Sequence, residues 1–73
     1  MDKQENADII KDGQVFEALP SALFRVRLDE SKEELIAYLA GKMRINKIKV
    51  LVGDRVSVRI DPYGGRGRIV KRL

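Results

Sequence analysis

The sequence predicts a small all-β domain, a barrel or a sandwich, on the strength of three observations. Short stretches alternate apolar with polar residues, which is typical of strands that bury one face. Turn-forming residues separate these stretches roughly every ten residues, as in small β-barrels and sandwiches. The chain has 73 residues, enough for one domain with one small core. We expect that domain at residues 8–73, after a flexible polar tail at residues 1–7.

The first predicted strand covers residues 9–19. Apolar groups lie on both of its faces, so the alternation does not show which face is buried. Gly13 interrupts the stretch and predicts a bulge or a sharp coil, which a small barrel needs in order to close. Pro20 and Ser21 end the strand and begin a tight turn.

The second predicted strand, at residues 22–28, has the clearest alternation in the chain. Arg25 and Arg27 share one face and should point into water. The opposite face is apolar and should lie in the core: Phe24, Val26 and Leu28. Residues 29–32 then form a hairpin loop.

The stretch at residues 34–40 is open to two interpretations. As a strand, it presents alternate apolar side chains to the core and leaves Tyr38 on the other face. As a helix, it would begin with a capping box between Ser31 and Glu34. We favour the strand, because Gly41 would cut the helix short. The side chains that then face the core are Leu35, Ala37 and Leu39.

The second half of the chain predicts one helical turn and two more strands. The helical turn lies at residues 42–47, with Met43 packed on the barrel. A fourth strand at residues 55–60 alternates without interruption, and the loop at residues 61–67 contains three glycines, which indicate positive φ or mobility. The last strand, at residues 68–72, closes the sheet. In the fourth strand the residues expected to point outward are Arg55, Ser57 and Arg59.

Composition excludes several classes of function. The chain has no Cys and no His, which removes disulfides, thiolate and imidazole metal sites, and the commonest general base. The carboxylates at residues 29–34 are expected in solvent, where they make poor general acids or bases at neutral pH. We therefore expect a binding protein and not an enzyme, with no metal and no cofactor. Because no apolar run could span a bilayer and the N-terminus is too polar for a signal peptide, we expect a cytoplasmic protein.

Charge is divided unevenly along the chain. Residues 41–73 hold ten of the fifteen Lys and Arg and only two acids, Asp54 and Asp61, for a net charge of +8, whereas residues 1–40 carry −4. Concentrated positive charge predicts a polyanionic partner, because neutralising phosphates releases condensed counterions. The alternative is a basic surface with no partner. We favour polyanion binding, since strand alternation displays the cations outward.

Three groups of residues are candidate RNA contacts, and the first combines cations with an aromatic ring. If their strands are neighbours, Arg25 and Arg27, Tyr38, and Arg55 and Arg59 form one basic face with an exposed ring. Such a face suits irregular or single-stranded RNA, because cations follow the backbone while a ring stacks on a base. The alternative for Tyr38 is a rim residue that packs on its neighbours.

The second group is the helical segment and the residues after it. Lys42, Arg44, Lys47 and Lys49 follow one another closely, with no acidic residue among them to pair with. Cations on a projecting element can enter a groove of folded RNA. The alternative is an ordinary solvated helix surface.

The third group is the glycine-rich loop with the last strand. Glycines let the backbone approach phosphates closely, while arginines supply bidentate contacts. The alternative is a loop that serves only as a turn. The cations of this group are Arg66, Arg68, Lys71 and Arg72.

Five short segments carry a resemblance to a known family. They are Glu17-x-Leu19-Pro20-x-x-x-Phe24-Arg25-Val26-x-Leu28, Gly41-Lys42-Met43-Arg44, Gly53-Asp54-x-Val56, Pro62-Tyr63 and Gly67-Arg68-Ile69-Val70. Together they resemble bacterial translation initiation factor one, in the right order and close to the right spacing. The resemblance covers residues 10–72, nearly the whole chain.

The resemblance implies a five-stranded OB-fold barrel with one short helix after the third strand. It implies binding to the small ribosomal subunit at the aminoacyl-tRNA site, with contacts to ribosomal RNA of the decoding region and to a neighbouring ribosomal protein. It also implies support for initiation factors two and three, and we expect the protein to act as a monomer. By matched position, the implied RNA contacts are Lys42, Arg44, Lys49, Arg66 and Arg68.

Two other functions remain open at this point. A general RNA chaperone of the cold-shock kind would use the same barrel on unstructured RNA, although two Tyr and two Phe are few rings for that purpose. A scaffolding protein would use the basic half of the chain to bind acidic proteins.

Overall fold

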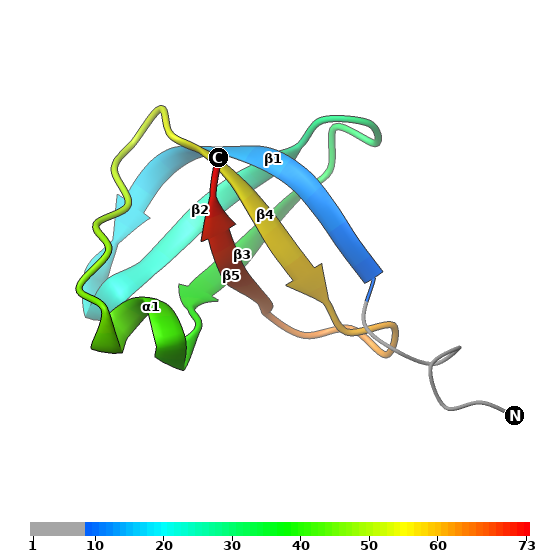
Figure 1. Cartoon of the computed structure of the whole chain (residues 1–73). Coiled ribbons are helices and arrows are strands. Elements are labelled where there is room, and N and C mark those ends of the chain that lie inside the picture. The colour runs from blue at the N-terminus through cyan, green and yellow to red at the C-terminus, as the bar shows by residue number, and fades with distance from the viewer. Residues whose placement is uncertain (1–8) are drawn as a thin grey trace, which may run out of the picture.

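Residues 9–73, the part of the chain that the computed structural model describes, form a closed five-stranded barrel (Figure 1). The strand order is β1-β2-β3-β5-β4, in which β3 and β5 run parallel and all other neighbours run antiparallel. The tail predicted at residues 1–7 lies outside the described residues. The elements are β1 (Ile9–Leu19), a short 3₁₀ helix (Pro20–Ala22), β2 (Leu23–Leu28), β3 (Glu34–Leu39), α1 (Gly41–Ile45), β4 (Arg55–Ile60) and β5 (Gly67–Arg72).

The predicted strands and the helical turn after the third strand are confirmed. The helical interpretation of residues 34–40 is wrong, because β3 pairs with β2 on one side and with β5 on the other. Of the three glycines predicted to need positive φ or mobility, Gly64 and Gly65 have φ values of 99° and 98°. Gly67 instead begins β5. No helix within residues 9–73 is long and apolar enough to cross a membrane.

Strand β1 closes the barrel by pairing with two partners. Its first half pairs with β4 and its second half with β2, and only Gly13 and Gln14 pair with both. A Cβ atom added at Gly13 would lie 2.5 Å from the backbone oxygen of Arg27, so a side chain does not fit at the closing point. Of the two features expected at Gly13, a bulge or a sharp coil, the bulge is not there. The register between β1 and β2 shifts instead between Val15 and Glu17, while the ladder is continuous across Gly13.

The core is apolar and lies inside the ring of strands. Val26, Val56, Val58 and Ile69 are fully buried, as the alternation predicted for β2 and β4. Burying an aliphatic side chain of this size stabilises a fold by about 1.5 to 3 kcal/mol. One expectation is corrected: Ser57, predicted to point outward, is buried, and its hydroxyl donates a 2.8 Å hydrogen bond to the cross-strand partner Asp12.

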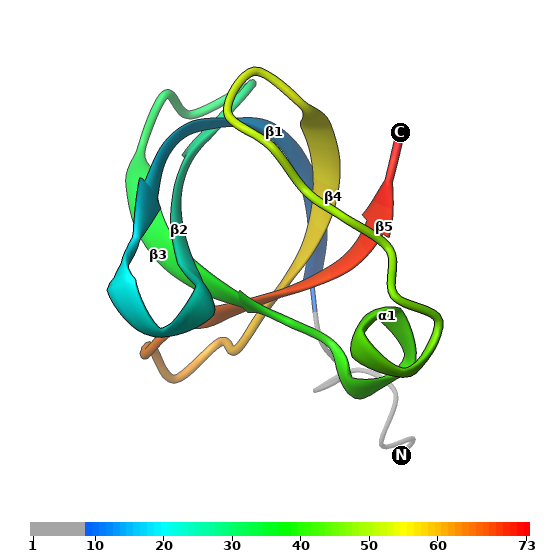
Figure 2. The same ribbon diagram turned by 90° about the vertical axis from the view of Figure 1, so that its left-hand side faces the viewer.

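Helix α1 sits outside the ring of strands and is fixed by one side chain, as Figure 2 shows from the end of the barrel. Met43 is 2% exposed and belongs to the core cluster, as predicted. The helix ends in a Schellman motif, in which Ile48 N–H donates to the Met43 carbonyl and Lys47 N–H donates to the Arg44 carbonyl. Lys47 holds the left-handed position of this motif, with φ of 55°, where glycine is usual.

Candidate nucleic-acid interface

The cations of α1 project from the barrel because the residue between them is buried. Lys42 and Arg44 flank Met43 in the sequence, so anchoring Met43 in the core turns both of them into solvent. No ion pair within residues 9–73 involves either one. They are therefore available to an anionic partner.

Two more exposed cations follow α1, on a segment that forms no strand within residues 9–73. Lys47 stands at the end of the helix, and Lys49 lies one residue before the buried Val50. The side chain of Arg72 donates a 3.0 Å hydrogen bond from Nη1 to the Lys49 carbonyl. Predicted as an RNA contact, Arg72 therefore also ties this segment to β5.

A second cluster of cations surrounds Tyr38, and strand register brings it together. Arg68 of β5 pairs with Tyr38 of β3 on one side and with Arg59 of β4 on the other. The Arg68 guanidinium lies 5.8 Å from the centre of the Tyr38 ring, a distance that suits a cation–π contact. Its Nε donates a long hydrogen bond of 3.4 Å to the tyrosine hydroxyl.

This second cluster lines a shallow cavity of about 110 Å³. The loop before β5 contributes Arg66 and Asp61 to its wall. Asp61 is a single carboxylate among three arginines, and its Oδ1 accepts a hydrogen bond from the backbone N–H of Tyr63. The cavity thus offers a ring, several N–H donors and one acceptor within a small space. Its lining residues are Tyr38, Arg59, Asp61, Arg66 and Arg68.

The two clusters adjoin each other. Helix α1 follows β3 after one residue, Ala40, whose N–H donates to the Ile69 carbonyl of β5, and α1 packs against β5. We call their combined surface the α1–β5 surface. It comprises Tyr38, Lys42, Arg44, Lys47, Lys49, Arg59, Arg66 and Arg68.

Arg25 and Arg27 are not part of that surface, which corrects the expectation of one basic face. In the strand order, β1 separates β2 from β4, so the arginines of these two strands are not neighbours. Arg25 Nε lies 3.0 Å from the carboxylate of Glu17, its cross-strand partner on β1. Arg27 Nη2 lies 2.7 Å from Glu34, its cross-strand partner on β3.

Two further ion pairs involve the loop that follows β2. Lys11 approaches Glu30 at 3.6 Å, and Arg55 donates from both of its terminal nitrogens, Nη1 and Nη2, to Asp29. The hydrogen bond to Asp29 and the charge of that carboxylate raise the pKa of Arg55. A raised pKa stabilises the folded state at all pH values below the ordinary pKa of arginine, so this effect is constant around neutrality.

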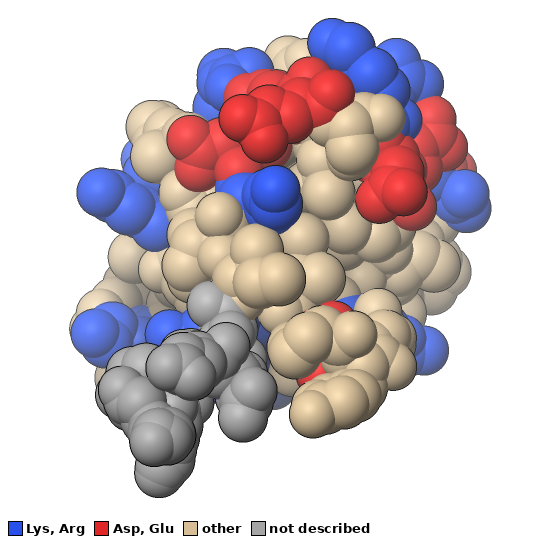
Figure 3. Space-filling view, turned by 90° about the vertical axis from the view of Figure 1, so that its right-hand side faces the viewer, with Lys and Arg blue, Asp and Glu red and all other residues tan. Residues whose placement is uncertain are grey.

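We call this region the ion-paired side. Figure 3 shows acidic side chains gathered there among Lys and Arg, on the face that carries the loop between β2 and β3. Sequence reasoning missed these pairs, because only the strand register reveals which carboxylate lies across from which arginine. The side comprises Lys11, Glu17, Arg25, Arg27, Asp29, Glu30, Glu34 and Arg55.

No metal site is evident within residues 9–73. No group of three carboxylates there is close enough to hold a metal ion, and the chain has no Cys or His. What the arrangement offers chemically is an array of charged donors around one ring, which suits phosphates and bases.

Comparison with known proteins gives a family match over almost the whole chain. Residues 2–73 match the family described as Translation initiation factor 1A / IF-1. The chain is also similar to the solution structure of translation initiation factor one from the Wolbachia endosymbiont strain TRS of Brugia malayi. The two are 37% identical with a TM-score of 0.77, and the match covers 99% of this chain and 85% of that one. This similarity supports the expected OB-fold.

Two larger proteins contain a similar barrel. The crystal structure of YjeQ from Thermotoga maritima is 31% identical with a TM-score of 0.75, over 89% of this chain. The crystal structure of YloQ, a circularly permuted GTPase, is 25% identical with a TM-score of 0.75, also over 89% of this chain. In each case the match covers only 23% of the larger protein.

Proposed function

Because this chain belongs to the translation initiation factor 1A / IF-1 family, we propose that it binds the small ribosomal subunit at the aminoacyl-tRNA site. As an initiation factor it would act there by occupancy: while the site is filled, tRNA cannot enter early. No bond is made or broken in this function. The binding partner is ribosomal RNA of the decoding region, and the α1–β5 surface is the part that meets it.

The observation that carries the proposal is the separation of two kinds of cation. Lys42, Arg44, Lys47 and Lys49 are exposed and have no carboxylate partner within residues 9–73. When they neutralise phosphates, counterions are released and no internal ion pair is lost. The cations of the ion-paired side would have to give up a carboxylate first.

The cavity beside Tyr38 suits a nucleotide that has left the base stack. Its ring can stack on a base, and Arg59, Arg66 and Arg68 can hold the neighbouring phosphates. Folded ribosomal RNA supplies such nucleotides at loops and bulges. The cavity therefore favours RNA of irregular shape as the ligand over a regular duplex.

The remaining parts of the proposal rest on the family. We expect contacts with a neighbouring ribosomal protein, support of initiation factors two and three, action as a monomer, and work in the cytoplasm, where ribosomes initiate. The coarse role, a translation initiation factor, follows from the family. We expect this factor to bind RNA without catalysing a reaction.

Co-sedimentation with isolated small subunits tests the proposal. We expect saturable binding that weakens as salt rises, and loss of binding when a tRNA anticodon stem-loop occupies the aminoacyl-tRNA site. Binding that the stem-loop leaves unchanged would contradict the proposed place of action.

The same assay separates this function from a general RNA chaperone. The four aromatic rings do not form a platform: Phe24 is in the core, Phe16 lies under the Arg27 guanidinium, and Tyr63 is on a loop, so Tyr38 stands alone among the arginines. A chaperone would bind short unstructured oligonucleotides as tightly as it binds small subunits. We expect much weaker binding to such oligonucleotides.

A further inference from the structure

Strand β1 leaves part of one edge open, on the ion-paired side of the barrel. In its second half, the edge turned away from β2 is covered, because Val15 N–H donates to the Asp54 carbonyl and Val15 C=O accepts from Gly53 N–H. In its first half, β1 pairs with β4, but β2 ends at Leu28, opposite Gly13. On the edge turned away from β4, residues 9–12 therefore extend past the end of β2, and no strand of the described part of the chain lies beside them there.

The open backbone groups can be assigned from the alternation of the strand. Asp12 C=O points away from β4, since it accepts a hydrogen bond from Asp29 N–H in the loop after β2. Residues two apart on a strand direct their backbone groups to the same side. Ile10 N–H, Ile10 C=O and Asp12 N–H thus face the same gap, and within residues 9–73 no hydrogen bond satisfies them.

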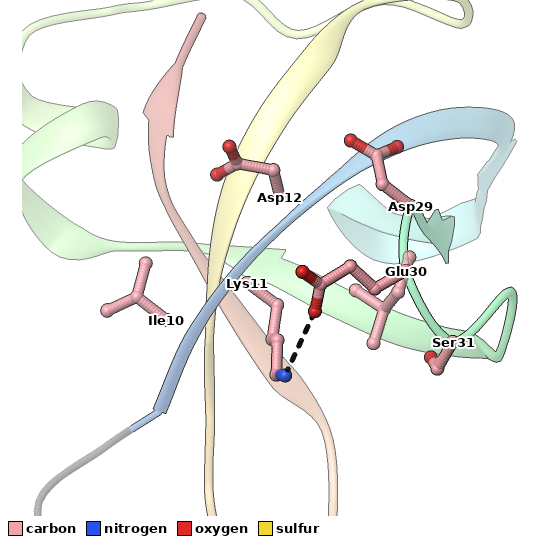
Figure 4. Close-up of a pocket in the computed structure, with 7 residues that line it drawn as sticks. Ile10, Lys11, Asp12, Asp29, Glu30 and Ser31 are labelled. Carbon is pink, nitrogen blue, oxygen red and sulfur yellow. Dashed lines mark ion pairs between the residues drawn. The ribbon is translucent and has the colours of Figure 1, made fainter.

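The gap is a real depression and not only a space between ribbons. A cavity of about 290 Å³ lies between β1 and the loop after β2. Figure 4 shows lining residues on β1 and on the loop after β2, with the Lys11–Glu30 ion pair joining the two walls. Ile10 adds apolar surface, since it is 49% exposed. The lining residues are Ile10, Lys11, Asp12, Leu28, Asp29, Glu30 and Ser31.

From these observations we infer that the open edge of β1 at residues 9–12 accepts an extended, basic peptide segment of a partner protein as an added strand. The backbone groups of Ile10 and Asp12 bond the main chain of the segment, which is how exposed sheet edges recognise peptides. We call this site the β1 notch.

Charge decides the kind of partner. Three carboxylates and one ammonium line the notch, so it is net negative. Asp29 is engaged by Arg55, but the Glu30 side chain is 84% exposed and holds Lys11 only at 3.6 Å. A Lys or Arg of the incoming segment can replace Lys11 at Glu30 without uncovering a buried charge. Nucleic acid would meet these carboxylates with its phosphates and be repelled.

The notch and the α1–β5 surface can be occupied at the same time. Figure 1 shows α1 on one flank of the barrel and the loop between β2 and β3, which forms one wall of the notch, on the opposite flank. A peptide in the notch would therefore leave the exposed cations of α1 free. This inference does not depend on the proposed RNA contacts.

A peptide titration followed by amide NMR of the full chain tests the inference. The probe is a heptapeptide that alternates Lys with Val, and the matched control is the same peptide with Glu in place of Lys. We expect the Lys peptide to shift the amides of Ile10, Asp12, Asp29 and Glu30, with weaker binding at higher salt, and we expect the Glu peptide to shift none of them. Shifts centred on α1, equal binding of both peptides, or no shifts at millimolar peptide would overturn the inference.

Two variants locate the binding. Ile10→Pro removes a donor that faces the notch and leaves the β4 ladder intact, because proline is tolerated where the N–H points away from the partner strand. We expect it to lower the affinity for the Lys peptide at least about fivefold, which corresponds to the loss of one hydrogen bond. Glu30→Gln leaves the backbone hydrogen-bonding groups unchanged. It should lower the affinity for the same peptide about threefold, because one surface ion pair is lost. If Ile10→Pro fails to fold, the affinity of Glu30→Gln for the Lys peptide still tests the inference.

Unchanged affinity in Glu30→Gln would contradict the basic partner, and unchanged affinity in folded Ile10→Pro would contradict the added strand. A second copy of this chain is the other possible occupant. Sedimentation of the free protein as a dimer that the Lys peptide dissociates would show self-association at this edge and overturn the assignment to a partner protein.

Discussion

The α1–β5 surface and the ion-paired side carry similar side chains but use them differently. On the ion-paired side, Arg25 and Arg27 lie across from Glu17 and Glu34, so each guanidinium is held by the neighbouring strand. On the α1–β5 surface, the cations of α1 and of the segment after it have no strand partner, and no ion pair within residues 9–73 engages them. The difference teaches that net charge alone does not locate a binding surface. A cation that is already paired with a carboxylate contributes to the stability of the barrel, whereas an unpaired cation is available to RNA.

The largest expected effect comes from reversing charge on the α1–β5 surface. Lys42→Glu combined with Arg44→Glu should weaken binding to small subunits at least about a hundredfold, since two charge-assisted contacts become repulsive. Co-sedimentation at fixed salt measures the change. The matched control is Lys11→Glu on β1 with Lys32→Glu on the loop between β2 and β3, which alters net charge equally away from that surface.

We expect the control pair to stay within about threefold of the unmodified protein, because long-range charge effects are screened at physiological salt. If both pairs lose affinity equally, binding follows net charge and the contrast between the two sides fails.

Truncating one arginine on each side should separate stability from binding. Arg27→Ala loses the Glu34 ion pair and the contact with the Phe16 ring, whose guanidinium-to-centroid distance is 5.3 Å. We expect a loss of about 1 kcal/mol of unfolding free energy and little change in affinity. Arg44→Ala should do the reverse, with roughly tenfold weaker binding and unchanged stability. Thermal unfolding and co-sedimentation of both variants would expose any deviation from this crossed pattern.

Replacing Lys47 should have a smaller effect, and one replacement should raise the stability of the fold. It occupies the left-handed position of the Schellman motif, where a side chain is strained and glycine is favoured. Lys47→Gly should therefore stabilise the fold by about 0.5 to 1 kcal/mol while weakening RNA binding a few-fold. Lys47→Ala is the control, because it removes the charge and keeps the strain. If Gly and Ala variants unfold at the same temperature, Lys47 is not strained.

The smallest expected effect distinguishes a phosphate contact from a positioning residue. Lys49→Gln should reduce the slope of log affinity against log salt by about 0.7 to 0.9, as expected for one lost phosphate contact. Arg72 holds the Lys49 carbonyl, so Arg72→Gln should weaken binding about threefold with the slope unchanged. A slope that falls equally in both variants would make Arg72 a phosphate contact, as the sequence alone suggested.

The sequence predicted the parts of this fold that depend on local pattern. Alternation in β2 assigned Phe24 and Val26 to the core, and the good helix formers at residues 42–47 predicted a helical turn with Met43 packed on the barrel. Both follow from the types and order of neighbouring residues, which one sequence displays directly.

The parts that failed depend on partners distant in the sequence. The exposure expected for Ser57 was wrong because Asp12, 45 residues away, lies across from it. The prediction of a single basic face was wrong because β1, and not β2, is the neighbour of β4. Gly13 was correctly linked to barrel closure, but its role is close approach to Arg27 and not a bulge.

The most direct test of the contrast between the two sides uses lysines as reporters. Amine modification followed by mass spectrometry compares the reactivity of each lysine in the free protein and in its complex with small subunits. If the α1–β5 surface meets ribosomal RNA, Lys42, Lys47 and Lys49 become strongly protected while Lys32 keeps its reactivity. Protection of Lys32 with continued reactivity of Lys42 would contradict the account.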